Sequence, residues 1–327
     1  MTLQRKLASL TACACVAVAP CLAFADPIQG GWLPRQLFPW DNYWNVDISW
    51  APVDWRSDDF IAFANRWGTI RLHPDLGGND WFDPDVNFGL PYIVVDWWQP
   101  TVWVEFDYPS VSDQVGYPIP DEAIWNAHWI QGGWPGRVWA RDQDRHMLIV
   151  DRDNNHLYEL YNVWFDLGRW KWVAGGGASW DMNTNNRRPE GWPGADESGM
   201  SMLPGVLRYD EVYGGDEIAH ALRISIGEYN GYVFPASSAS GWTNGALPLG
   251  ARLRLKANFD ISGYPWDVQK IFRAMKTYGL IVATRCPGDF FFVSGNYDTR
   301  WNNNIMNSAF HSLTAWNFEV VQLGWTP

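Results

Sequence analysis

The chain has 327 residues, of which 47% are hydrophobic and 18% are charged. A chain of this length and composition can bury a sizeable core, which excludes a disordered polypeptide. Acidic residues outnumber Lys and Arg by 36 to 24, and the formal charge of −12 argues against a nucleic-acid binder, because phosphate contacts supply most of that affinity. The 24 Trp residues exceed what a core needs, so we expect some of them to bind a neutral partner.

Residues 1–25 have the pattern of a secretory signal peptide. Arg5 and Lys6 precede an apolar stretch, and Ala23–Ala25 supplies the small residues of a cleavage site. We therefore expect export to the periplasm or the extracellular space, with a mature chain that begins near Asp26. No second apolar run in the sequence is long enough to cross a membrane.

Cysteine usage indicates a fold without an internal disulfide. Cys13, Cys15 and Cys21 lie in the signal segment, which leaves Cys286 alone in the mature chain. Cys286 follows an apolar strand-like run, and we interpret it as a buried thiol instead of a nucleophile. A lipoprotein anchored at Cys13 is an alternative, but the apolar stretch before this residue is too short.

The mature chain begins with an irregular segment and continues mainly with strands. Residues 26–54 are rich in Trp, Pro and Asn without a helical period, which predicts a wrap around the core. Apolar residues at helical spacing predict one short helix between Ser57 and Gly68 and a second between Pro265 and Gly279. The predicted strands are Tyr92–Val95, Thr101–Phe106, His146–Val150, His156–Tyr161, Val206–Val212, Ile218–Ile226, Ala251–Lys256, Leu280–Thr284 and Phe290–Val293.

These elements predict the fold class. Many short strands separated by Gly, Asn and Asp favour an antiparallel β-sandwich, jelly-roll-like, over a doubly wound parallel sheet. We expect a mainly β protein with two short helices and the Trp-rich N-terminal wrap. Because no linker or repeat interrupts the chain, 26–327 is interpreted as a single domain, with a sub-boundary near residue 145 as the alternative.

One predicted hairpin brings acidic side chains close to a histidine. If Val212 faces Ile218 across a Gly-rich turn, Asp210 lies opposite His220 on one face. Glu211 then points to the other face. A carboxylate facing an imidazole sets the tautomer of the ring and raises its basicity, which suits proton transfer, although a structural ion pair is the alternative.

The densest acidic interval of the chain also holds tryptophans, a combination that a sugar-binding groove requires. Indoles stack on the apolar faces of pyranose rings, while carboxylates accept hydrogen bonds from hydroxyls or transfer protons. Asp210 and Glu211 are our first catalytic candidates and Asp196 is the third, with Asp181 as a further partner. The predicted substrate-binding residues are Trp172, Trp180, Trp192, Arg208 and Arg223.

Two other chemistries stay open from the sequence. His73, His146 and His220 are dispersed histidines that would have to converge to bind a metal, and no zinc-type spacing is present, so no metal or other cofactor is expected. A polysaccharide lyase would use His220 or Tyr209 as base. Its carboxylate-neutralising arginines would come from Arg208, Arg223, Arg252 and Arg254.

Several stretches of the sequence resemble segments of known proteins. These stretches are Phe38–Asn45 with Asp47–Ser49, Leu72–Asp75, Asp144–Asp153, Leu203–Val212 and Ile261–Gly263. Together they resemble a group of exported bacterial proteins of unassigned function. The resemblance spans most of the mature chain. It implies an association with polysaccharide-handling modules and transfers no catalytic residue.

The sequence thus predicts a secreted carbohydrate-active enzyme that hydrolyses glycosidic bonds of a neutral polysaccharide. Asp210, Glu211 and Asp196 supply its carboxylates, and His220 tunes one of them. A non-catalytic glycan-binding protein is the first alternative and a polysaccharide lyase is the second. The expected partner is a polysaccharide or oligosaccharide, with no nucleic acid and no membrane span.

Overall fold

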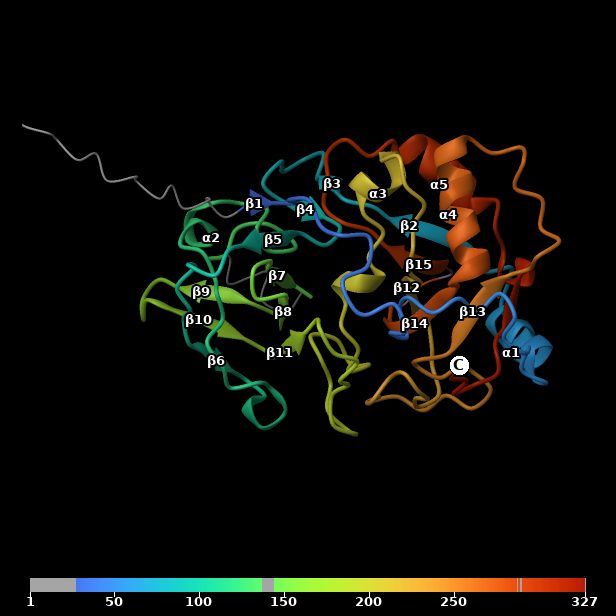
Figure 1. Cartoon of the computed structure of the whole chain (residues 1–327), viewed down its shortest axis with the longest axis horizontal. Helices are drawn as coiled ribbons and strands as arrows, with labels where there is room; N and C mark the ends of the chain where they lie inside the picture. Colours follow the sequence, from blue (N-terminus) through green and yellow to red (C-terminus); the bar gives the residue numbers. More distant parts are fainter. Residues whose placement is uncertain (1–27, 137–143, 287, 289, 327) are drawn as a thin grey trace, which may run out of the picture.

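The computed structural model describes residues 28–136, 144–286, 288 and 290–326. The predicted signal peptide at 1–25 and the mature start near Asp26 lie outside these residues. The protein is mainly β, as expected, and Figure 1 shows most strands of the N-terminal half on one side and the longer helices on the other. Within the described ranges, no helix is long and apolar enough to cross a membrane.

The N-terminal half is built on a five-stranded sheet. Met147–Asp151 is buried throughout, and such a continuous buried run is typical of a strand covered on both faces. It pairs with the following strand as a hairpin, whose turn places Asn155 in the left-handed region at φ 51°. In sheet order the strands are β1 (Ile28–Gln29), β5 (Tyr92–Val95), β7 (Met147–Asp151), β8 (His156–Tyr161) and β11 (Gly176–Asp181).

Alternate residues of the central strands face two different cores, as the period of two requires. Ile149 packs toward a small three-stranded sheet together with Trp172, whereas Val150 packs toward the irregular N-terminal segment, which contributes Leu37 and Phe38. The three-stranded sheet consists of β6 (Val104–Phe106), β10 (Lys171–Ala174) and β9 (Trp164–Asp166).

The C-terminal half is built on a six-stranded sheet that carries helices. Helix α4 (Trp266–Thr277) buries Val268, Ile271, Phe272 and Met275, residues at helical spacing, in the largest core of the protein. In sheet order the strands are β16 (Phe318–Val320), β13 (Arg252–Leu255), β14 (Leu280–Arg285), β12 (Leu222–Ile226), β15 (Phe290–Ser294) and β2 (Arg71–Asp75). The accompanying helices are α1 (Ser57–Ala64), α4 (Trp266–Thr277) and α5 (Asn303–His311).

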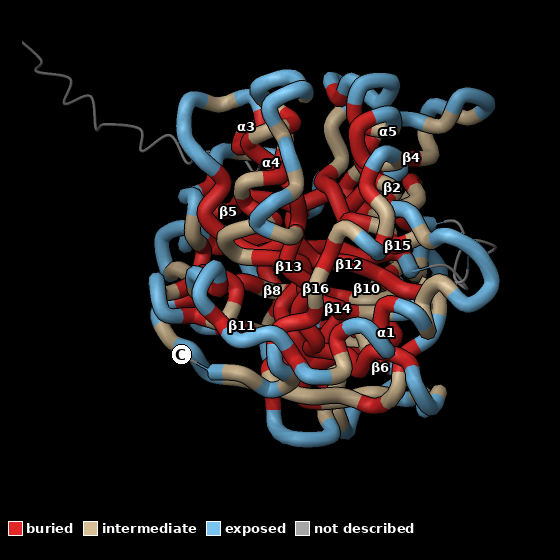
Figure 2. Tube along the Cα trace, turned by 90° about the vertical axis from the view of Figure 1, so that its right-hand side faces the viewer, coloured by how far each residue is buried: buried red, intermediate tan, exposed pale blue. Residues whose placement is uncertain are grey.

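The remaining short elements lie in connections. They are β3 (Gly78–Asn79), β4 (Asn87–Phe88), η1 (Pro109–Val111), α2 (Glu122–Trp125), η3 (Leu203–Gly205), α3 (Tyr209–Tyr213) and η4 (Ala315–Asn317). Figure 2 shows that strands of the six-stranded sheet, such as β12, β13 and β14, lie in the buried interior, while the loops at the periphery are exposed. Residue 145 lies two positions before the start of β7, a central strand of the first sheet.

Two expectations about the strands are corrected by the structure. The sheets are mixed, because β5–β7, β12–β14, β15–β2 and β10–β6 are parallel pairs, so the strands are not arranged as an antiparallel sandwich throughout. The predicted strand Val206–Val212 is wrong, because Tyr209–Tyr213 forms α3. Glu211 accepts a hydrogen bond from the Arg208 backbone N–H at 3.3 Å, which closes the first helical turn. The predicted hairpin with 218–226 therefore does not form.

Candidate functional site

A cavity of about 790 Å³ lies where the five-stranded and six-stranded sheets meet. One wall comes from the six-stranded sheet, including Asp75, Arg223 and Ser294. The opposite wall includes Tyr161 on β8 of the five-stranded sheet and His146 just before β7. This volume is within the range of small-molecule sites, which is about 300 to 1,000 Å³.

Three neighbouring strands place a polar row on the cavity wall. Ser294 on β15 is the register partner of Asp75 at the end of β2. On the other side of β15, Arg223 on β12 donates from Nη1 to the Ser294 hydroxyl at 2.8 Å. Because residues directly across neighbouring strands share a face, β12, β15 and β2 align a guanidinium, a hydroxyl and a carboxylate.

Arg223 holds Asp196 in the connection between the two sheets. Its Nη2 donates to Asp196 Oδ2 at 2.8 Å, and both side chains are almost fully buried. The other carboxylate oxygen of Asp196 accepts from the Ser198 backbone N–H at 2.9 Å and from the Ser198 hydroxyl at 2.6 Å. With both oxygens occupied, Asp196 is a positioned counter-ion and not a free acid.

Asp75 has the electrostatics of a proton donor. Its side chain is open to the cavity and yet surrounded by protein, and this loss of water raises its pKa above the ordinary value. The positive charge of Arg223 opposes the effect, and the negative charge of Asp144 adds to it. Among the described residues, no hydrogen bond to the Asp75 carboxylate is formed, so this group is available to a ligand.

Asp144 is the second exposed carboxylate of the site. It lies on the chain just before β7, so the five-stranded sheet positions it while the six-stranded sheet positions Asp75. A smaller cavity of about 220 Å³ adjoins the first, and Asp75, Asp144 and Gln131 line both. The two acids therefore lie at the junction of an extended recess. Burial raises the pKa of the Cys286 thiol, and the charges of Asp75 and Asp144 add to this shift. The thiol of this cavity residue therefore stays protonated.

The basic groups of the cavity are already engaged by the protein. His146 lies between Gln131 Oε1 at 2.6 Å from Nδ1 and the Ala195 carbonyl at 3.1 Å from Nε2, and burial lowers its pKa. Burial raises the pKa of Tyr161, and the nearby Asp144 charge adds to this shift. Tyr161 therefore stays protonated at neutral pH, and both ring nitrogens of His146 already contact protein oxygens.

Glu197 ties the cavity loop to the six-stranded sheet. Oε1 accepts from the Arg285 backbone N–H at 3.0 Å, and Oε2 accepts from the Ser240 hydroxyl at 2.8 Å and from the Tyr229 hydroxyl. This carboxylate lines the cavity, but its hydrogen bonds assign it to loop anchoring.

The residues of the predicted hairpin form a buried cluster outside the described cavities. His220 Nε2 contacts Glu211 Oε1 at 3.0 Å, so an acid does face this histidine, but it is Glu211 and not Asp210. Arg208 pairs with the same carboxylate at 2.5 Å. Burial alone would raise the pKa of Glu211, whereas Arg208 and His220 hold it below its ordinary value. Burial raises the pKa of Asp210, which is half-exposed beside Arg208.

Two of the predicted sugar-binding tryptophans are corrected by their burial. Trp172 and Trp180 are 3% and 5% exposed and pack in the cores, so neither can stack on a glycan. Trp192 is half-buried beside Arg188. The exposed aromatic surface comes from other residues, among them Trp67 at 86% and Trp81 at 92%.

The three histidines considered for a metal have separate partners. His73 Nδ1 contacts His311 Nε2 at 2.7 Å, while His146 and His220 have the partners given above. Within the part of the chain that the structure describes, no three His, Cys, Asp or Glu side chains are grouped to hold a metal ion.

Sequence reasoning missed Asp75 and Asp144 as site residues. Both lie in stretches that carry the resemblance, and Asp75 ends the segment Leu72–Asp75 after Pro74, a residue that argues against a strand. Pro74 is tolerated because β2 is an edge strand of its sheet. Comparison of the chain with protein-family models, curated proteins and solved structures found no match.

Proposed function

We propose that this protein is an exported glycoside hydrolase that cleaves a neutral polysaccharide, with Asp75 as general acid and Asp144 as its partner carboxylate. The observation that carries the proposal is Asp75 itself, a ligand-accessible carboxylate with a raised pKa at the junction of two cavities. Glycoside hydrolysis requires one protonated carboxylic acid and one ionised carboxylate on either side of the scissile bond.

The two carboxylates have environments suited to different roles. Asp75 is desolvated and repelled by Asp144, which favours the protonated form that donates to a leaving oxygen. Asp144 is exposed, so a water molecule or a substrate can reach the carboxylate, as the role of base or nucleophile requires. The ion pair of Arg223 and Asp196 holds the wall on which Asp75 lies and takes no part in proton transfer.

A lyase is the second candidate, because His146, Tyr161 and Arg223 line the same cavity. Hydrolysis is favoured over it for two reasons. Asp196 already neutralises Arg223, which a lyase would need for the substrate carboxylate. The raised pKa of Tyr161 keeps its phenol protonated at neutral pH, and both ring nitrogens of His146 are occupied by contacts with Gln131 and Ala195.

We also infer that the five-stranded and three-stranded sheets, which share one core, constitute a β-sandwich. In this proposal the sandwich supplies Asp144, and the six-stranded sheet supplies Asp75. A polymer bound between them would contact both halves of the chain, in keeping with the single-domain interpretation.

The test is hydrolysis of a panel of neutral and uronate-containing polysaccharides by the wild type, Asp75→Asn and Asp144→Asn. We expect new reducing ends without unsaturated products. Turnover in both variants should fall by about a hundredfold or more, the typical contribution of general acid–base catalysis. Because the general acid must be protonated, wild-type activity falls as pH rises through the raised pKa of Asp75.

Asp59→Asn is the matched control, because Asp59 is an exposed acid on α1. It should retain full activity. Unsaturated products would show that the protein is a lyase and not a hydrolase. Binding of a glycan without any product would make the protein a glycan-binding module, and unchanged activity of Asp75→Asn would reject the assignment of the acid.

A further inference from the structure

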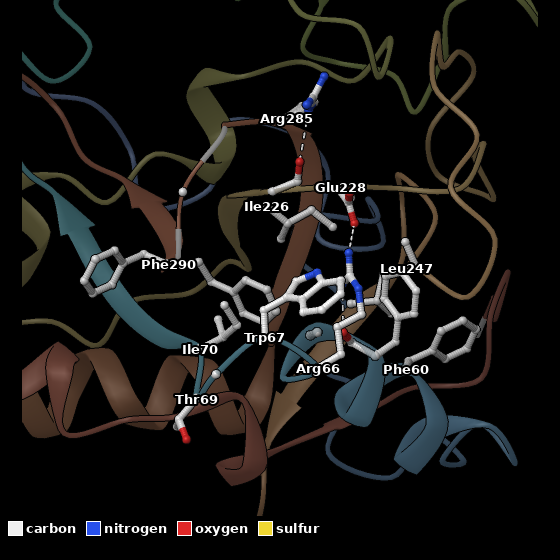
Figure 3. Close-up of a pocket in the computed structure, with 17 residues that line it drawn as sticks. Phe60, Arg66, Trp67, Thr69, Ile70, Ile226, Glu228, Leu247, Arg285 and Phe290 are labelled. Atoms are coloured by element: carbon white, nitrogen blue, oxygen red, sulfur yellow. Dashed lines mark hydrogen bonds and ion pairs between the residues drawn. The ribbon is translucent and has the colours of Figure 1, made fainter.

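A second cavity, of about 420 Å³, opens between the end of α1 and the ends of β12 and β15. Figure 3 shows the Trp67 indole lying across this pocket, between Phe290 on one side and the Arg66 side chain on the other. The buried residues Phe60, Ile226 and Phe291 form an apolar part of the lining. An exposed indole above an apolar floor can hold a ring that is apolar on its faces.

The polar groups of the pocket are an ion pair, Arg66 with Glu228 (Figure 3), and the side chain of Arg285, whose Nε donates to the Gly227 carbonyl at 3.0 Å. The Arg66 guanidinium also lies 3.8 Å from the centroid of the Phe63 ring. The ion pair adds no net charge, but it presents N–H donors and carboxylate oxygens side by side. This combination matches the hydroxyls on the edge of a neutral sugar.

The pocket lies next to the proposed catalytic cavity, around the ends of the same strands. Ser225 and Phe292 line the catalytic cavity, whereas their chain neighbours Ile226 and Phe291, together with Phe290 at the start of β15, line the aromatic pocket. Arg285, at the end of β14, lines both. A polymer that rounds this end of the sheet can contact both places.

We propose that the pocket of Arg66, Trp67 and Glu228 is a second carbohydrate-binding site that holds a sugar unit of a neutral polysaccharide and anchors the polymer next to the catalytic cavity. The identity of the substrate class rests on the proposed function. The site itself rests on the exposed indole, the charge-neutral polar pair and the position of Arg285 between the two cavities.

The experiment measures binding and turnover with Trp67→Ala and with Trp55→Ala as control. Trp55 is also 86% exposed and flanks α1, but it does not line the pocket. Binding of the neutral polysaccharides of the panel is measured by affinity electrophoresis in the Asp75→Asn background. Turnover is measured on the polymer and on a trisaccharide of the same linkage.

We expect Trp67→Ala to weaken polymer binding about tenfold, the size of one good aromatic contact, and to lower kcat/KM on the polymer but not on the trisaccharide. Trp55→Ala should leave both unchanged. Equal binding by Trp67→Ala and the parent protein, or no binding of any polysaccharide by either, overturns the second site. If Asp75→Asn stays active while Trp67→Ala loses binding, the catalytic assignment fails and the second site stands.

Discussion

At the scale of single residues, the carboxylates of this protein differ in role because their surroundings differ. Asp75 is open to a cavity, whereas Glu159 on β8 is fully buried and serves the fold. Glu159 accepts the backbone N–H groups of Met202 and Leu203 at 2.8 and 2.9 Å. It thereby joins the five-stranded sheet to the connection that leads to the second sheet. Burial raises the pKa of Glu159 to about 7.

Because of this shift, we predict that the free energy of unfolding depends on pH through Glu159. The Glu159→Gln variant should lack this part of the pH dependence. A carboxyl whose pKa is higher in the folded state stabilises the protein fully below its unfolded value of 4.5, and this contribution is lost as pH rises through about 7. The loss is on the order of 3 kcal/mol. Urea unfolding at pH 5 and pH 8 should show a smaller difference between the two pH values for Glu159→Gln, and an unchanged difference would contradict the role.

At the scale of elements, helix α3 explains why the acids predicted from the sequence are buried. The turn at Tyr209–Tyr213 directs Glu211 inward, where Arg208 and His220 contact it. Lys270 on α4 donates to the Glu211 carbonyl at 2.8 Å and to the Gly214 carbonyl at 2.7 Å, which fastens the end of α3 to α4. The cluster thus connects α3, the segment just before β12, and α4.

We therefore predict that Glu211→Ala lowers stability by about 3 to 5 kcal/mol, because it leaves the Arg208 charge buried without its partner. Chemical denaturation measures this loss. For the variant molecules that remain folded at low temperature, kcat should stay within twofold of the wild type. A stable Glu211→Ala protein without activity would restore Glu211 as a catalytic residue.

At the scale of the whole molecule, the N-terminal segment holds the two sheets together. Trp44 is fully buried in the core of the six-stranded sheet, and its ring contacts the connection at Gly205, which adjoins Arg223 on β12. Leu37 and Phe38, a few residues earlier, pack on the other sheet. Residues of one segment thus belong to two cores, which favours cooperative unfolding of both halves.

This packing predicts that an alanine substitution destabilises the protein at one glycine and has no effect at another. A Cβ on Gly205 would lie 2.5 Å from the Trp44 ring and 2.9 Å from the Arg223 Cβ, whereas a Cβ on Gly215 would meet nothing within 4 Å. Gly205→Ala should cost about 1 to 3 kcal/mol through overpacking, and Gly215→Ala should be neutral. Thermal melting of the two variants compares them. Equal melting temperatures would show that Trp44 can shift freely.

The sequence by itself determined the elements whose signal is local. The buried run of β5 and the hairpin partner His156–Tyr161 were predicted with their observed bounds, because hydrophobic runs and turn residues lie within a few positions. The helix after Pro265 is confirmed for the same reason, since its apolar residues recur at helical spacing.

Only the tertiary structure decided which polar residues meet at the candidate site. Asp75 and Arg223 come together because β15, a strand from near the end of the chain, lies between β2 and β12. No local pattern encodes that strand order or the parallel pairing of β2 with β15. The predicted pairing of Asp210 with His220 failed because the backbone at 209–213 closes a helical turn and directs Glu211 to the histidine. Residue types indicated acid chemistry, and long-range strand pairing selected Asp75 and Asp144 to face the cavity.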